Sequence, residues 1–310
     1  MRVFVAGASG AIGTVLVPQL VARGHEVTGT SKSPARADRV RALGAKAVTL
    51  DLLDARAVRQ AVLDAQPEAI IHQATALANF RFGRNLDRSF AQTNRLRTEG
   101  TDALLAAARE AGVRRFIAQS FASYRYARVG GPVKTEDDPL DPSPAATARQ
   151  TNAAMTHLDQ AVTGAGGVAL RYGGFYGGSN DGLAGPVRKR RLPIVGDGGA
   201  VSSFINLDDA AAATVLALDH DATGIYNITD DEPAPMRDWL PVLAAALGAR
   251  PPRHVPRWLV RLFMGEGLDM MTGSRGASNA KAKRELGWTL RYPSWREGFP
   301  AAYGSHRRIT

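Results

Sequence analysis

Residues 3–13 read VFVAGASGAIG, and this stretch indicates the architecture of the whole chain. A short apolar run suits a buried strand, three glycines follow it, and the periodic segment 12–23 predicts a helix. Glycine permits a tight turn between strand and helix and lets the backbone approach a phosphate. Because a helix N-terminus presents unpaired N–H groups, the stretch predicts a cradle for a dinucleotide pyrophosphate, with a purely structural turn as the alternative. The predicted cradle residues are Gly7, Ser9, Gly10, Ala11, Ile12 and Gly13.

Outward from this turn, short aliphatic runs alternate with helical patterns through the first two thirds of the chain. Strands are expected at residues 3–5, 26–28, 47–50, 69–71, 116–118 and 168–170, and helices at 12–23, 35–43, 55–65, 147–163 and a long segment ending near Ala111. This alternation predicts βαβ units and, with right-handed crossovers, an α/β Rossmann fold with a doubly wound parallel sheet.

Beyond Arg171 the alternation gives way to stretches rich in glycine and proline, such as GGFYGGSNDGLAGP and ARPPRHVP. Residues 208–218 and 225–228 are expected to return to the sheet. We therefore expect a Rossmann domain formed by residues 1–171 plus 204–231, and a smaller substrate-binding lobe formed by residues 172–203 plus 232–310.

The composition fits a globular enzyme without metal or thiol chemistry. The 310 residues are 45% hydrophobic, which is enough for a large core. Lys and Arg outnumber Asp and Glu by 39 to 29, but only Arg188–Arg191 form a dense cluster, either a solvated helix end or a contact for an anionic ligand. There is no cysteine, and the six histidines lack metal-ligand spacing. No apolar run of about 20 residues occurs, so we expect a cytoplasmic protein without membrane or nucleic-acid partners.

The spacing GxxGxxG resembles that of the short-chain dehydrogenase/reductase superfamily, and further segments resemble its extended or atypical, NAD-dependent epimerase/dehydratase-like branch. These segments are Asp51-Leu52, His72–Ala76, Asn94 with the helix and strand up to Ser120, Ser203–Asp209 and Gly224–Asn227. The resemblance covers roughly residues 1–300. It implies a nicotinamide cofactor, a small-molecule substrate and a possible homodimer. It also implies that Asp51 and Leu52 contact adenine and that Gln73, Ala74 and Thr75 line the cofactor ribose.

The turn after the second strand bears on the choice of nicotinamide cofactor. An NAD site usually ends this strand with an acid that accepts a hydrogen bond from the ribose 2′-OH. Residues 30–36 read TSKSPAR, with hydroxyls and bases but no acid. This favours NADP(H), with Ser31, Lys32 and Arg36 as candidates for the 2′-phosphate, and an ordinary polar turn is the alternative.

The catalytic pattern departs from the superfamily, whose members carry a Tyr-x-x-x-Lys pair on the helix after the serine. The resemblance places Thr147 and Thr151 where tyrosine and lysine belong. A threonine hydroxyl is too weak an acid to replace an activated tyrosine. The remaining catalytic candidates are Ser120, Tyr126, Tyr124 and Asn94. The two tyrosines could instead pack under the loop.

Several neighbouring residues are expected to lie in a loop, to line the pocket or to be structural. The segment containing Lys134 and Glu136 is expected to be a solvated loop, with an alternative base as the other interpretation. Tyr172 and Tyr176 are expected to line the pocket, and His72 is expected to be structural.

Three functions agree with this pattern. The first is an NADP(H)-dependent oxidoreductase that acts on a small or medium organic substrate. The second is a non-redox enzyme of the epimerase/dehydratase type, and the third is an inactive NADP(H) sensor. The missing Tyr-x-x-x-Lys pair supports the last two functions, whereas Ser120, Asn94 and the aromatic residues support the first two.

Overall fold

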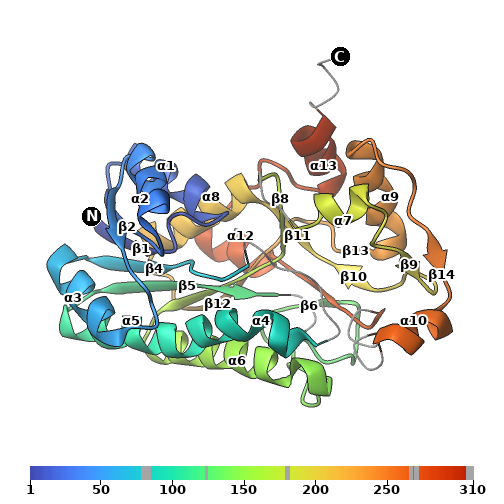
Figure 1. Ribbon diagram of the computed structural model, residues 1–310, viewed down its shortest axis with the longest axis horizontal. Helices are drawn as coiled ribbons and strands as arrows, with labels where there is room; N and C mark the ends of the chain where they lie inside the picture. The colour runs from blue at the N-terminus through green and yellow to red at the C-terminus, as the bar shows by residue number, and fades with distance from the viewer. Residues whose placement is uncertain (78–84, 123–124, 179–181, 265–267, 269–271, 305–310) are drawn as a thin grey trace.

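The computed structural model describes residues 1–77, 85–122, 125–178, 182–264, 268 and 272–304, and its centre is a parallel sheet (Figure 1). The strands are β1 (Arg2–Ala6), β2 (Glu26–Ser31), β3 (Lys46–Thr49), β4 (Ala69–His72), β5 (Arg115–Phe121), β7 (Val168–Tyr172) and β12 (Gly224–Ile228). Their order is β12-β7-β5-β4-β1-β2-β3, and every pairing is parallel. The order reverses at β1, so the crevice for a dinucleotide is expected at the carboxyl ends of β1 and β4.

Helices cover both faces of the sheet (Figure 1). One face carries α1 (Gly13–Ala22), α2 (Pro34–Ala42) and α8 (Leu207–Asp219). The other face carries α3 (Ala55–Ala65), α4 (Leu86–Arg95), α5 (Thr101–Glu110) and α6 (Arg149–Gly164), with a π-helical turn, η1 (Leu96–Gly100), joining α4 to α5. Strand β1 shows why the apolar runs are continuous: Val3 and Val5 enter one core, and Phe4 enters the other. A strand buried on both faces needs apolar residues at every position.

The smaller lobe is built from short elements around an aromatic core. Its strands are β8 (Gly174–Tyr176), β9 (Ile194–Val195), β10 (Val201–Ser202), β11 (Phe204–Asn206), β13 (Ala234–Pro235), β14 (His254–Val255) and β15 (Gly276–Ala277), which pairs with β6 (Val133–Lys134). Its helices are α7 (Ala184–Arg188), α9 (Met236–Ala246), α10 (Arg257–Met264) and α13 (Trp295–Tyr303), and α12 (Ala280–Leu286) lies between the last two in sequence. The ring of Phe204 lies 5.0 Å from that of Trp239 and 5.2 Å from that of Phe299, both edge-on. These contacts give the lobe a core of its own.

The predicted fold class is confirmed: the sheet is doubly wound, and a smaller lobe is formed by segments before and after its last strand, β12. One segment behaves differently from its neighbours in sequence, because Ala282 and Leu286 of α12 pack into the core of the sheet rather than into the lobe. The predicted helix 147–163 is a 3-10 turn, η2 (Ala146–Ala148), followed by α6. Among the described residues, no helix combines the length and hydrophobicity that crossing a bilayer requires.

Candidate cofactor and catalytic site

The glycine turn brings the first strand against the loop after β4. Gly7 has a φ of 88°, and a Cβ added to it would lie 2.7 Å from both the Cα and the N of Ala74. A Cβ on Gly13 would lie 2.5 Å from the carbonyl oxygen of Ala8. Both contacts are with backbone atoms, which cannot move aside as a side chain can. The first and third glycines are therefore required by the close approach of β1, α1 and the β4 loop.

The turn leaves backbone donors available for an anion. The N-cap of α1, Ile12, makes no side-chain capping hydrogen bond. Within the described part of the chain, the amides of Ala11 and Ile12 have no acceptor, whereas Gly10 N–H donates to Gly7 O at 3.0 Å. Unpaired amides at the start of a helix suit a pyrophosphate. The cradle fits a dinucleotide, and Gly7, Ser9, Gly10, Ala11, Ile12 and Gly13 would hold its phosphates.

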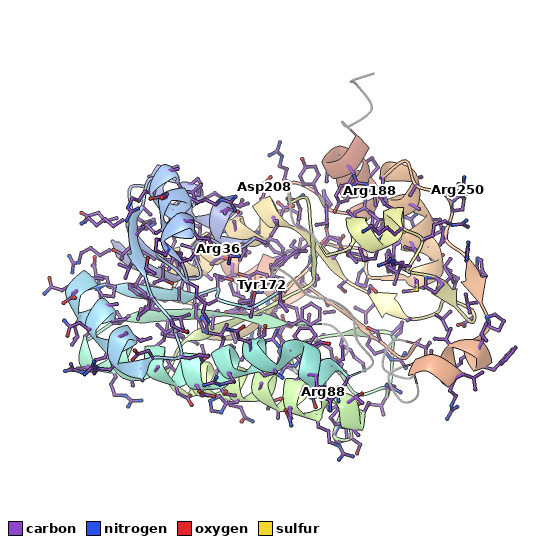
Figure 2. The ribbon with its side chains drawn as sticks, viewed as in Figure 1. Arg36, Arg88, Tyr172, Arg188, Asp208 and Arg250 are labelled. Carbon is purple, nitrogen blue, oxygen red and sulfur yellow. The ribbon has the colours of Figure 1, made fainter. Side chains whose placement is uncertain are left out.

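The other predicted cofactor residues lie at the same edge of the sheet. Ser31 ends β2, Asp51 follows β3, and Gln73 follows β4. The Lys32 Nζ atom lies 3.2 Å from Asp51 Oδ2, with both side chains about half exposed. The Leu53 N–H, and to a smaller extent Lys32, hold the pKa of Asp51 below its usual value. No carboxylate ends β2, and Arg36 lies exposed on α2 (Figure 2).

The loop after β4 is fixed by His72. Its Nε2 donates to the carbonyl oxygen of Leu96 at 3.2 Å, and its Nδ1 accepts from Ala74 N–H at 3.4 Å. Burial lowers the pKa of His72 to about 4, so the ring is neutral at neutral pH. These contacts tie the cofactor edge to η1.

Replacing His72 with glutamine is expected to reduce the loss in the free energy of unfolding that the protein shows at acid pH. The unfolded chain binds a proton near pH 6.5 and the folded chain only near 4, so stability is full above pH 6.5 and falls as pH drops through that window. The loss amounts to about 3 kcal/mol at its limit. Urea unfolding at pH 7.5 and 4.5 checks this, with exposed His254→Gln as the control; an unchanged profile in His72→Gln would contradict it.

Thr151, which the resemblance matches to the superfamily's lysine, is fully buried. Thr151 donates to Asp87 Oδ1 through both its N–H and its Oγ1, each at 2.8 Å. Asn94 Nδ2 in turn donates to Thr151 Oγ1 at 3.1 Å. The position of the tyrosine holds Thr147, which is half-buried. Neither an acidic phenol nor a cation is present at these two positions.

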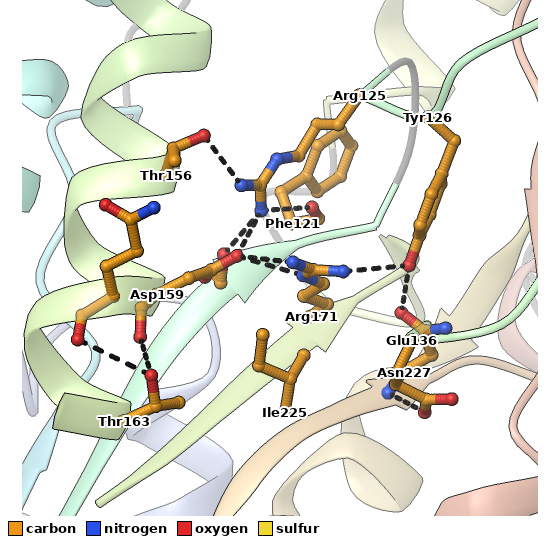
Figure 3. Close-up of polar contacts among 12 residues, drawn as sticks. Phe121, Arg125, Tyr126, Glu136, Thr156, Asp159, Thr163, Arg171, Ile225 and Asn227 are labelled. Carbon is orange, nitrogen blue, oxygen red and sulfur yellow. Dashed lines mark hydrogen bonds and ion pairs between the residues drawn. The ribbon is translucent and has the colours of Figure 1, made fainter. Parts of the chain in front are cut away.

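Ser120 and Tyr126 belong to a buried polar network at the ends of β5 and β7. Figure 3 shows Arg125, Tyr126 and Arg171 of this network. Ser120 Oγ accepts from Arg125 Nη1 at 3.0 Å. Tyr126 OH donates to Asn227 Oδ1 at 2.8 Å and accepts from Arg171 Nη1 at 3.2 Å. Burial raises the pKa of Tyr126 despite the nearby Arg171. The phenol proton is thus committed to Asn227, which is the geometry of a structural tyrosine; Tyr124 lies outside the described residues.

Asp159 of α6 is the centre of this network, and no sequence motif pointed to it. Its Oδ2 lies 2.9 Å from Arg125 Nη1 and 2.8 Å from Arg171 Nη2. All three side chains are at most 4% exposed. Two guanidinium groups share one carboxylate and fix the loop after β5 to α6.

Two further expectations concern charged residues. Lys134, expected to be solvated, is 2% exposed, with its Nζ donating to Val129 O and, at 3.1 Å, to Asp138 Oδ1. Glu136 accepts from Asn227 N–H at 2.7 Å. Both therefore anchor the loop rather than solvate it. Arg188 is exposed on the smaller lobe, away from Arg36 (Figure 2).

The geometry defines a class of protein: a Rossmann fold with a glycine-rich turn between its first strand and first helix, and a smaller lobe. The chain belongs to the NAD dependent epimerase/dehydratase family, which matches residues 3–229. This confirms the predicted superfamily and branch.

The similar proteins include reductases and epimerases. The chain is 44% identical, over 96% of its length and 99% of the relative's, to a 3-diazoavenalumate denitrifying reductase from a Streptomyces species. It is 30% identical to a 2-alkyl-3-oxoalkanoate reductase from Stenotrophomonas maltophilia over 80% of this chain and 76% of that one. The solved Thermus thermophilus UDP-glucose 4-epimerase complex with NAD is 25% identical to this chain and superposes with a TM-score of 0.76. The match covers 100% of both chains. A nicotinamide dinucleotide is thus the cofactor of the family.

Proposed function

We propose that this protein is an NADP(H)-dependent reductase that replaces the dinitrogen group of an aromatic diazo compound with hydride. Residues 1–171 plus 204–231 would bind the cofactor, and residues 172–203 plus 232–310 would bind the substrate. The 44% identical relative supports the reaction class, because its name refers to a diazo compound, to loss of nitrogen and to reduction.

The observation that carries the proposal is the buried Thr151 and its partner Asp87 at the position of the missing lysine. Reduction of a carbonyl adds hydride to carbon and a proton to oxygen, so it needs an acid beside the substrate. At a diazonium carbon, hydride supplies the electron pair of the new C–H bond, and the C–N electron pair leaves with N2. No proton is consumed. An active site for this reaction therefore does not need the acid that the Tyr-x-x-x-Lys pair provides.

The bound nicotinamide would supply the hydride, and the chain's residues would position it. The cradle amides would hold the pyrophosphate, while Asp51 and Leu52 would flank the adenine and Gln73, Ala74 and Thr75 the ribose. In this proposal Ser120 and Asn94 would lie near the substrate carbon that accepts the hydride. Tyr126 acts only through the loop that it anchors.

The reaction is tested with NADPH deuterated at the transferable position and benzenediazonium tetrafluoroborate, with heat-denatured protein as the blank. The expected result is monodeuterated benzene in excess of the blank, detected by mass spectrometry. Ethyl 2-methylacetoacetate, a 2-alkyl-3-oxo ester, serves as the carbonyl probe and is expected to remain unreduced. Deuterium in the alcohol alone would replace the proposal with carbonyl reduction, and deuterium in neither product would favour the non-redox or sensor function.

Replacing Lys32 with alanine is expected to weaken NADPH about 10- to 100-fold and NADH much less, because a hydrogen-bonded ammonium–phosphate contact contributes about 1.5–3 kcal/mol. Lys32 lies next to Ser31, and its present partner Asp51 is half exposed, so the ammonium is accessible to a 2′-phosphate. Fluorescence titration measures both affinities. Exposed Lys46→Ala is the matched control, and equal losses for the two cofactors would refute the NADP assignment.

Replacing Tyr126 with phenylalanine is expected to leave kcat within about threefold and to cost about 1 kcal/mol of stability, the contribution of a typical hydrogen bond. The hydroxyl bonds Asn227 and Arg171 within the protein. Steady-state kinetics and urea unfolding measure the two effects. A 100-fold fall in kcat with unchanged stability would restore Tyr126 as a proton donor.

A further inference from the structure

Two chains of hydrogen bonds each end, at the cofactor edge, on an amide oxygen that has no partner in the part of the chain that the structure describes. The first runs from Asp87 through Thr151 to Asn94. A carboxylate only accepts, so the Thr151 hydroxyl donates to Asp87 and must accept from Asn94. The Asn94 group that faces Thr151 is therefore the NH2, and the amide orientation is fixed by the chemistry of its partners.

The second chain begins in α8 on the opposite face of the sheet. Thr214 Oγ1 donates to the carbonyl oxygen of Ala210 at 2.8 Å and so accepts from Tyr172 OH at 2.6 Å. Tyr172 OH must then accept from Gln73 Nε2, which lies 3.2 Å away. The Gln73 amide is oriented by the same logic as that of Asn94.

Both chains leave an acceptor unpaired. Asn94 Oδ1 and Gln73 Oε1 are buried and have no hydrogen-bond partner among the described residues, and the side chains are 8% and 3% exposed. A buried acceptor without a donor costs about 1–3 kcal/mol, so a ligand that brings a donor to it gains that amount.

The surroundings place both side chains at the loop after β4, at the edge of the sheet where the cofactor would lie. Gln73 follows β4 directly, and the neighbour of Asn94, Thr93, accepts through Oγ1 from Ala76 N–H at 3.1 Å. Asn94 is thus fixed between the β4 loop and Thr151, the position of the superfamily's lysine. The nicotinamide riboside half carries ribose hydroxyls and a carboxamide NH2, which are donors.

We propose that Asn94 Oδ1 and Gln73 Oε1 accept hydrogen bonds from the nicotinamide riboside half of the cofactor. These uncharged amide oxygens, oriented by Thr151 and Tyr172, would hold this half by accepting from its hydroxyl and carboxamide donors. The inference rests on the cofactor part of the proposed function and does not depend on the substrate.

The test compares two ligands by isothermal titration: NADPH, and adenosine 2′,5′-bisphosphate, which lacks the nicotinamide riboside half. Thr151→Val removes the hydroxyl that orients Asn94, and Thr151→Ser keeps it. Thr151→Val is expected to weaken NADPH up to about tenfold, the contribution of one hydrogen bond, and to leave the bisphosphate unchanged. Thr151→Ser is expected to bind both ligands as the unsubstituted protein does.

Gln73→Leu tests the second oxygen independently and keeps the inference falsifiable if Thr151→Val folds poorly. It is expected to weaken NADPH by a similar factor without affecting the bisphosphate. Equal losses for both ligands, or no loss for either, would overturn the role of the oxygen tested. The comparison is then repeated with NADH and ADP, which carry no 2′-phosphate. An error in the 2′-phosphate assignment would change the affinities for both NADPH and the bisphosphate, so it is distinguished from a failure of the present inference.

Discussion

Gly7→Ala is expected to abolish measurable NADPH binding and to destabilise the fold by about 2–4 kcal/mol, the range for strain combined with overpacking. The φ of 88° disfavours any residue with a Cβ. The added carbon would also lie 2.7 Å from backbone atoms of Ala74, so relief requires β1 or the β4 loop to move. Because the cradle amides and Gln73 lie on these two segments, such a movement removes the pyrophosphate site.

The control is Gly24→Ala, which isolates the conformational cost. Gly24 has a φ of 79°, and nothing lies within 4 Å of a Cβ added there. Gly24→Ala should lower the free energy of unfolding by about 1 kcal/mol through backbone strain alone and leave cofactor affinity unchanged. Urea unfolding and NADPH titration of both variants give the comparison. If the two variants behaved alike, the close approach of Gly7 to Ala74 would not be needed for binding.

Local sequence patterns predicted the architecture because strand, turn and helix are specified by neighbouring residues. The GxxGxxG spacing predicted the cradle, and the alternation of apolar runs predicted six of the seven strands of the sheet. The seventh, β12, was expected from residues 225–228 beyond the alternating region. The lobe was predicted only as a region, since strands of two or three residues carry no periodicity.

The polar network at the ends of β5 and β7 could not be predicted in the same way. Arg125 and Asp159 are separated by 34 positions in the sequence, and charged residues in a loop and a helix usually indicate solvent. The prediction that Lys134 is solvated was wrong for the same reason. The match of Thr151 to the superfamily's lysine position stays a prediction. Its partner Asp87 lies on another helix, and only the tertiary structure brings the two together.

Asp159→Asn is expected to destabilise the protein by about 3 kcal/mol or more, because it leaves two buried guanidinium groups without a countercharge. Asp159 makes every contact with Arg125 and Arg171 through Oδ2, and its Oδ1 has no partner among the described residues. An asparagine can place its oxygen at the Oδ2 position and keep those hydrogen bonds. The substitution therefore removes the charge while the geometry is retained.

Glu99→Gln in the exposed pair with Arg95 is the matched control, since it also neutralises a carboxylate that accepts from arginine. Those side chains are 57% and 52% exposed, so solvent screens the pair and the expected cost is much smaller than that of Asp159→Asn. Urea unfolding of both variants measures the difference. A cost for Asp159→Asn as small as that of the control would mean that water or another group compensates the guanidiniums. The loop after β5, with Ser120 at its start, would then be held to α6 by hydrogen bonds alone and not by the shared charge.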